Sequence, residues 1–355
     1  MSSSAGLSLG SVLGHEESVA RLRLQLRTGS VAHAYWITGP PRVGKTTLAL
    51  ALAGELLGAD GWPGGVLAHP DLWLDDEAGN LSVDRIRGGA EERGEGPSLQ
   101  HFLSLLAFGD RAKVAVIANA ERMTLVAANS LLRMLEEPPP RSVICLTTSR
   151  PESERLPSTL RSRCQELHLG PVDAEAIGSW LRSRAGCSQG VAEVAAAISQ
   201  GRPGLALELV ADQELEERGA SAVRRLVDCA GGGPGGWLSL SRELAERGRD
   251  REQATFALRS WTAFLRDCCC LAAGAPGRLT LPRWRKEAME WAEALGVVGC
   301  LRRYDLALDA LARLDESATA RLVLDRFLLL AFGGQPPIRP ASGRGDAGSP
   351  TSDLR

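Results

Sequence analysis

The stretch Gly39-Pro40-Pro41-Arg42-Val43-Gly44-Lys45-Thr46-Thr47 decides the fold of this chain. An apolar run, Ala34–Thr38, comes directly before it, and a helical pattern begins at Leu48. The spacing G-x-x-x-x-G-K-[ST] between a strand and a helix is that of a phosphate-binding loop. We therefore expect a P-loop domain in which residues 39–47 bind a nucleotide.

Each residue type in this loop has a chemical reason to be there. Gly39 and Gly44 let the backbone turn tightly and direct its N–H groups inward, and the next helix adds the positive end of its dipole. Lys45 is expected to reach the β- and γ-phosphates, and the Thr46 hydroxyl to bind Mg²⁺. The predicted cofactors are therefore ATP or ADP, with Mg²⁺.

The acidic residues that such a site needs for hydrolysis are missing from their usual place. A carboxylate after a second apolar strand normally orients Mg²⁺, and another polarises the attacking water. Here the strand Val114-Ala115-Val116-Ile117 is followed by Ala118 and Asn119. Glu121 is the only acid nearby, and we expect it to be a solvated loop residue. The sequence therefore predicts nucleotide binding with weak or absent intrinsic ATPase activity.

Composition limits the classes of function. The chain has 355 residues, is 44% hydrophobic and 24% charged, and carries a formal net charge of −2. Such a charge predicts no strong nucleic-acid affinity of its own. No apolar run is long enough to span a membrane, and residues 1–10 do not resemble a signal peptide. We expect a cytoplasmic protein of two or three domains that contacts no membrane.

The cysteines predict no zinc site. Eight are scattered along the sequence, and none forms a C-x-x-C pair. Cys268, Cys269 and Cys270 lie in a helical stretch, where successive side chains point about 100° apart and cannot easily share one ion. Buried thiols in a reducing compartment are the expected state.

Hydrophobic patterning divides the chain into a first α/β part and a later helical part. Five apolar runs separated by helical stretches predict a parallel five-stranded sheet: 34–38, 72–74, 114–118, 143–148 and 165–169. This α/β domain is expected over residues 1–170. A small helical lid is expected at 171–212 and an all-helical domain at 213–333, with a Gly-rich break at 231–236. Residues 334–355 are rich in Pro, Gly and Ser and are expected to be disordered.

Particular stretches of the sequence carry a family resemblance. They are His33-Ala34-Tyr35, the loop at 39–47, AANSLLRMLEEPPP at 127–140 and LPSTLRSRCQ at 156–165. Together they resemble bacterial clamp-loader subunits, the AAA+ proteins of the DNA polymerase III holoenzyme, and most of all their delta-prime type. The similarity is dense to about Leu169 and weaker beyond. It implies an AAA+ domain, a helical lid and a C-terminal collar domain that joins subunits.

The resemblance also implies roles for residues outside the loop. Arg163, in Ser162-Arg163-Cys164, matches the arginine finger that these proteins offer in trans to a neighbour's ATP. Thr148, at the end of a predicted strand, matches the first nucleotide-sensing residue. Gly204 stands where the second sensing residue, an arginine, is expected. The four-cysteine zinc module of many relatives is absent, because residues 51–100 contain no cysteine.

The expected function follows from this combination. The chain would join gamma/tau-type and delta-type subunits in a hetero-pentamer and support ATP-dependent loading of the sliding clamp onto primed DNA. Large side chains of the C-terminal helices are expected to contribute to assembly: Trp261, Phe264, Leu265, Trp284, Trp291, Leu322, Leu324, Phe327 and Leu328. One alternative is an active motor ATPase, gamma/tau-like or helicase-like. Another is a small-molecule phosphotransferase, which needs clustered acids or arginines over the loop.

Overall fold

The computed structural model describes residues 7–77, 79–88, 97–108, 111–245, 250–315 and 318–333. The chain divides into two compact units. Unit 1 consists of Met1–Ala176 and Gly201–Leu205, and unit 2 of Ile177–Gln200 and Ala206–Arg355. Residues of the predicted lid, 171–212, are shared between the two units. The predicted tail, 334–355, lies outside the described residues.

Unit 1 is built on a five-stranded parallel sheet with the strand order β2-β3-β4-β1-β5. The strands are β1 (Ala34–Thr38), β2 (Leu72–Asp75), β3 (Lys113–Ile117), β4 (Ser142–Thr148) and β5 (Gln165–His168). The predicted α/β class and the five parallel strands are therefore confirmed, with strand ends displaced by one residue at most. The strands are apolar throughout because both faces of a parallel sheet are covered by helices.

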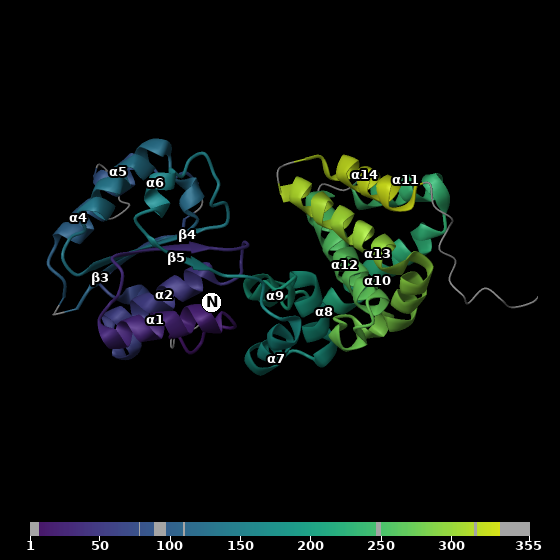
Figure 1. The fold of residues 1–355 in the computed structure, drawn as a ribbon, viewed down its shortest axis with the longest axis horizontal. Helices are drawn as coiled ribbons and strands as arrows, with labels where there is room; N and C mark the ends of the chain where they lie inside the picture. The colour runs from purple at the N-terminus through teal and green to yellow at the C-terminus, as the bar shows by residue number, and fades with distance from the viewer. Residues whose placement is uncertain are drawn as a thin grey trace, which may run out of the picture. The chain divides into compact units, whose positions relative to one another are not determined.

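Helices cover both faces of this sheet (Figure 1). On β1, Tyr35 and Ile37 belong to one apolar cluster with α1 and α2, whereas Trp36 belongs to the opposite cluster with α4, α5 and α6. The bounds of the helices of unit 1 are α1 (Glu16–Thr28), α2 (Lys45–Leu57), α3 (Val83–Arg87), α4 (Leu99–Ser104), α5 (Leu125–Glu136) and α6 (Ser158–Arg161). This arrangement places the loop after β1 on the side of the sheet where the carboxyl ends of all five strands lie.

Only helices and turns are found in the described part of unit 2. Its helices, together with those at its boundary with unit 1, are α7 (Ala174–Ala185), α8 (Gln189–Ser199), α9 (Pro203–Leu209), α10 (Leu215–Ala230), α11 (Gly233–Leu244), α12 (Asp250–Ala272), α13 (Arg285–Asp315) and α14 (Ala320–Phe332). Gly296, with φ 62°, interrupts α13. The predicted break at 231–236 was too long, because α11 already begins at Gly233. Pro234 lies in its first turn, where a proline fits without losing a hydrogen bond.

The core of unit 2 is aromatic. The Trp261 ring stacks on Phe327 with centroids 5.6 Å apart, and its Nε1–H donates to the Ala222 carbonyl at 2.8 Å. Phe264 and Trp291 meet edge to face at 5.2 Å. Most of the large side chains that we predicted as assembly contacts are therefore buried within the unit. Leu322, 67% exposed, is the exception.

Candidate nucleotide-binding site

The glycine at the start of the loop is required by its surroundings. Gly39 has φ 148°, in a region that other residues rarely adopt. A Cβ atom there would lie 2.3 Å from the Leu169 carbonyl oxygen, which no side chain tolerates. The Leu169 N–H in turn donates to the Thr38 carbonyl at 2.8 Å, which continues the pairing of β1 with β5. The loop therefore leaves the sheet against the backbone of the neighbouring strand.

Lys45 lies across the loop that precedes it. Its side chain is 5% exposed, and Nζ donates to the carbonyls of Gly39 at 2.9 Å and Pro40 at 2.7 Å. The third proton goes to Ser149 Oγ at 2.8 Å. Burial lowers the pKa of Lys45 to about 8, and the charge of Glu121 opposes this shift. At neutral pH the loop thus carries a buried cation beside its backbone amides.

The first turn of α2 completes an anion site. Gly44, with φ 113°, precedes the helix, and no side chain caps its first N–H groups. Such uncapped amides and the helix dipole favour a phosphate. Thr46 is partly buried, whereas Pro41, Arg42 and Thr47 are exposed and Val43 is buried in the core. Lys45, Thr46 and the helix amides fit a nucleotide phosphate with Mg²⁺.

Two further residues hold the loop from outside. The Gly204 N–H donates to the Arg42 carbonyl at 3.0 Å, and His15 Nε2–H donates to the Val43 carbonyl at 3.3 Å. A Cβ atom on Gly204 would lie 2.9 Å from the Arg42 oxygen. The position where the family resemblance expects a sensing arginine is therefore in direct backbone contact with the loop. Burial lowers the pKa of His15, which favours its neutral form.

The end of β3 brings an unexpected carboxylate to the site. Ala118 and Asn119 carry no acid, as the sequence shows, and Asn119 is exposed. Glu121, which we expected to be solvated, is partly buried instead. Its Oε1 accepts from the Ser149 N–H at 3.2 Å, and Oε2 is enclosed by protein. The short turn Ala120–Arg122 folds the chain back toward the end of β4, and the spacing of residues gave no sign of this.

The carboxyl ends of β4 and β1 lie side by side. The side chain that contacts Lys45 there is not that of Thr148, the residue predicted to sense the nucleotide. Thr148 is fully buried and pairs in register with Thr38, next to the loop. Its Oγ1 accepts from the Arg150 N–H at 3.0 Å. The hydroxyl that contacts Lys45 belongs to Ser149, which our sequence reasoning missed. A small hydroxylic residue after the fourth strand was the signal available for it.

Arg163 lies where the strands of the sheet begin, whereas the loop lies where they end. It precedes β5, and Gln165 pairs in parallel with Tyr35 near the start of β1, whereas the loop follows the end of β1. Its guanidinium donates to the Thr159 carbonyl at 3.0 Å and forms an ion pair with Glu136 at 2.7 Å. The strand polarity therefore keeps Arg163 away from the loop of its own chain.

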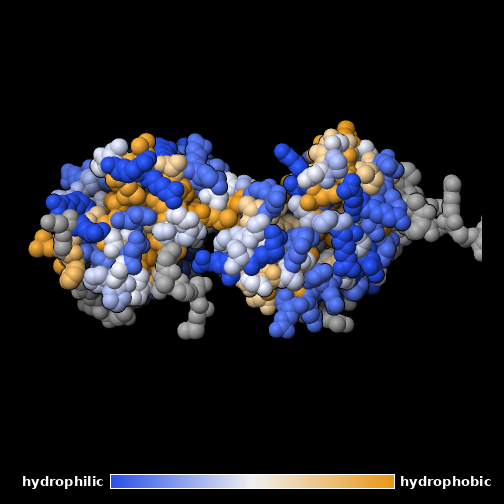
Figure 2. All heavy atoms as spheres, turned by 90° about the horizontal axis from the view of Figure 1, so that it is seen from below, coloured by the Kyte–Doolittle hydropathy of each residue, from blue (hydrophilic) through white to orange (hydrophobic). Residues whose placement is uncertain are grey.

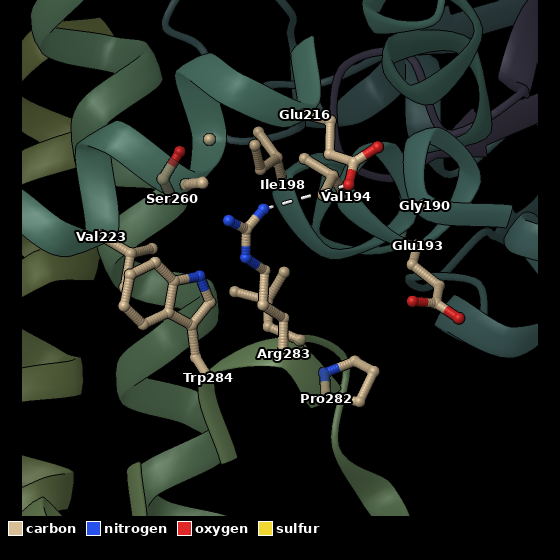
Figure 3. Close-up of a pocket in the computed structure, with 13 residues that line it drawn as sticks. Gly190, Glu193, Val194, Ile198, Glu216, Val223, Ser260, Pro282, Arg283 and Trp284 are labelled. Atoms are coloured by element: carbon tan, nitrogen blue, oxygen red, sulfur yellow. Dashed lines mark ion pairs between the residues drawn. The ribbon is translucent and has the colours of Figure 1, made fainter. Parts of the chain in front are cut away.

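A separate cavity of about 50 Å³ lies within unit 2 and contains none of the predicted site residues. Figure 3 shows Trp284, Val194 and Ile198 on its walls and an ion pair between Arg283 and Glu216, 4.0 Å apart, at its side. A space of this size holds a few water molecules and not a nucleotide.

Neither a metal-ligand cluster nor a membrane-spanning helix is present in the described ranges. In them no three His, Cys, Asp or Glu side chains converge as a metal site. Cys145, Cys229, Cys268 and Cys300 are buried and reduced, and burial raises the pKa of Cys145 to about 12. None of the helices in these ranges is long and apolar enough to cross a membrane. The absence of zinc stays a prediction.

Comparisons with known proteins find relatives of part of this chain. The family model for DNA polymerase III, delta subunit, matches residues 68–173. The delta-prime subunit from Escherichia coli K12 is 38% identical over 144 residues, 40% of each chain. The tau subunit from the same organism is 33% identical over 172 residues, 47% of this chain and 26% of that protein.

One solved structure extends over most of the chain. A DNA polymerase III gamma subunit-related protein from Thermotoga maritima covers 90% of this chain and 99% of its own, with 18% identity and a TM-score of 0.45. The sequence matches are shorter, and this chain spans 40% of the length of the E. coli delta-prime subunit. The chain is therefore similar over part of its length to the delta-prime subunits of DNA polymerase III, and residues 68–173 match the family model.

Proposed function

We propose that this chain is a delta-prime-type subunit of a DNA polymerase III clamp loader and supports ATP-dependent loading of the sliding clamp onto primed DNA. It would join gamma/tau-type and delta-type subunits in a hetero-pentamer. The similarity of residues 68–173 to the family model supports this role. The matched delta-prime and tau subunits belong to the same polymerase, which supports an assembly of related chains.

Within that assembly the chain would bind ATP or ADP with Mg²⁺ and hydrolyse it poorly. The contrast between an intact phosphate-binding loop and missing acids supports this part of the proposal. Lys45 is held over an intact loop with an uncapped helix beyond it, yet Ala118 and Asn119 offer neither a carboxylate for Mg²⁺ nor a base for water. Thr46 would supply the hydroxyl to the ion. The chemistry of the donors therefore favours binding over turnover.

Arg163 would act in trans on the nucleotide of a neighbour. The strand register supports this, because the arginine and the chain's own loop lie at opposite edges of the sheet. Its side chain is 35% exposed and is held by Glu136 on the same surface. An arginine that stabilises the transition state in this way contributes on the order of 10³–10⁵ to the rate in related NTPases.

Assembly would use exposed apolar residues of unit 2 and not its aromatic core. Figure 2 shows hydrophobic side chains on the surface of each unit among mostly hydrophilic ones. In unit 2 they come mainly from α13 and α14: Val297, Val298, Leu301, Leu308, Leu322, Leu329 and Leu330. Val298 is 81% exposed. Apolar surface of this kind is typical of interfaces between subunits.

The test begins with the natural complex. The chain is purified from its host under native conditions, and the proteins that come with it are identified. Polymerase III subunits and the sliding clamp are the expected companions. ATP affinity and steady-state turnover of the isolated chain are then measured. Measurable affinity with turnover far below 1 per second supports the proposal, since common enzymes turn over at about 1–10³ per second. Turnover in that range would instead support the motor ATPase.

A further inference from the structure

The unexplained group in the nucleotide site is Glu121. Its Oε1 accepts one hydrogen bond from the Ser149 backbone. Its Oε2 is enclosed and finds no hydrogen-bond partner among the described residues. A buried acceptor without a partner destabilises the fold, so its retention calls for a ligand or a function.

The turn that carries Glu121 is held firmly in place. Arg122 donates to the Ala118 carbonyl through Nε at 3.2 Å and through a terminal nitrogen at 3.0 Å, and it also forms an ion pair with the buried Asp75. The Leu81 N–H donates to the Arg122 carbonyl at 3.0 Å. These bonds fix the backbone on both sides of Glu121.

The carboxylate is linked to the lysine of the loop through one residue. Glu121 and Lys45 share Ser149: one accepts from its N–H, and the other donates to its hydroxyl. The charge of Glu121 also acts on the Lys45 ammonium. Because β4 lies between β3 and β1, this turn carries an acid across the end of β4 to the cation of the loop. Glu121 thus lies close to Ala118 and Asn119, the two positions where the site lacks a carboxylate.

We propose that Glu121 is the acidic group through which this loop holds the divalent cation of a bound nucleoside triphosphate. Its Oε2, which is enclosed by protein in this structure, would become accessible when the nucleotide binds and accept from the water shell of Mg²⁺, and the Thr46 hydroxyl would bind the ion. Hard cations such as Mg²⁺ prefer oxygen ligands and are usually held by one or two carboxylates plus the phosphates. This inference rests on the proposed nucleotide binding.

A simpler role for Glu121 makes the opposite prediction. If it only neutralised Lys45, it would repel phosphates whether or not Mg²⁺ is present, and removing its charge would strengthen ATP binding under both conditions. If it holds the cation, the charge is unfavourable without Mg²⁺ and favourable with it. The Glu121→Gln variant should then bind ATP more tightly than the wild type in EDTA and more weakly in Mg²⁺.

The experiment measures the Kd of ATP for the full chain in EDTA and in Mg²⁺. We expect Mg²⁺ to tighten binding at least about tenfold in the wild type, as a close charge pair allows, and about twofold or less in Glu121→Gln. Glu121→Leu, which buries no unpaired amide, is the second neutral variant and should behave alike. Glu154→Gln, at an exposed loop position, is the control and should match the wild type.

Each outcome decides one of the two proposals. An unchanged ratio of the two Kd values in whichever neutral variant folds, judged by circular dichroism, overturns the role of Glu121 and leaves nucleotide binding intact. Tighter binding under both conditions does the same and assigns Glu121 to charge neutralisation. Failure of the wild type to bind ATP under either condition overturns the proposed nucleotide binding, and the role of Glu121 with it.

Discussion

Replacing Gly39 by alanine tests how tightly the loop is fitted to the sheet. The new Cβ would lie 2.3 Å from the Leu169 carbonyl oxygen, while φ 148° is unfavourable for any residue with a Cβ. Backbone strain of this kind costs about 1–3 kcal/mol, and overpacking about 1–3 kcal/mol more. Gly39→Ala should therefore lower the free energy of unfolding of unit 1 by roughly 2–6 kcal/mol.

Gly44→Ala is the matched control. Gly44 also has positive φ, 113°, but a Cβ there would meet nothing within 4 Å. It should lose only the strain, about 1–3 kcal/mol. The difference between the two variants isolates the contact with Leu169.

The assay is hydrogen exchange by mass spectrometry, with and without low denaturant, on peptides from β1, the loop and β5. In Gly39→Ala, exchange should speed up in the loop and at the pairing of Thr38 with Leu169, which the Leu169 N–H makes at 2.8 Å. Peptides from α12 in unit 2 serve as an internal reference. Equal destabilisation of unit 1 by the two alanine variants would refute the reasoning, because the close approach would then have no energetic consequence.

Other predictions follow from the same structure. Lys45→Ala should abolish measurable ATP binding, and wild-type affinity should fall as pH rises above about 8, since burial lowers the pKa of the ammonium to about 8 and only the charged form attracts phosphate; a flat Kd from pH 7 to 9.5 would contradict this. Arg163→Ala should change the free energy of unfolding by less than about 1 kcal/mol, because exposed ion pairs contribute little. The same variant should lower the ATPase rate of a reconstituted complex in which every other arginine finger is disabled. Glu137→Gln is the control, and an unchanged rate excludes a role of Arg163 in trans. Val298→Asp should leave the chain folded but weaken its entry into the complex, with Leu24→Asp on the exposed face of α1 as the control, and normal stoichiometry by size-exclusion chromatography would exclude that surface. Elemental analysis should find no stoichiometric zinc, and one equivalent that survives dialysis against a chelator would overturn this.

The α/β part of the fold was predictable from the sequence, because its signals are local. The strands of a covered parallel sheet are apolar at every position, and the loop at 39–47 fixes the strand and helix on either side of it. The helical part was predictable in class but less so in detail. The glycines at 231–236 were read as a break, although Pro234 in the first turn allowed a helix to begin there.

The candidate site was predictable where it depends on one short stretch and not where it depends on contacts between strands. Lys45 lies where the motif places it. The positions of Ser149 and Glu121 are set by the register of β4 and by a short turn, neither of which leaves a periodic signal. The aromatic residues of 261–328 were misread for a similar reason. Residue type alone does not distinguish a core tryptophan from one at an interface, and burial of Trp261 and Trp291 decides it.

The opposite placement of Arg163 and the loop has a consequence for symmetry. In a two-fold dimer the same patch serves both copies, so an arginine reaches the partner's loop only if both lie within one self-complementary patch. Neighbours that repeat head to tail meet through two different patches, the arginine side of one chain and the loop side of the next. The parallel strands of a single sheet thus give the chain a direction. In any open row of such chains, the loop of the chain at one end receives no arginine from a neighbour. The arginine of the chain at the other end contacts no loop.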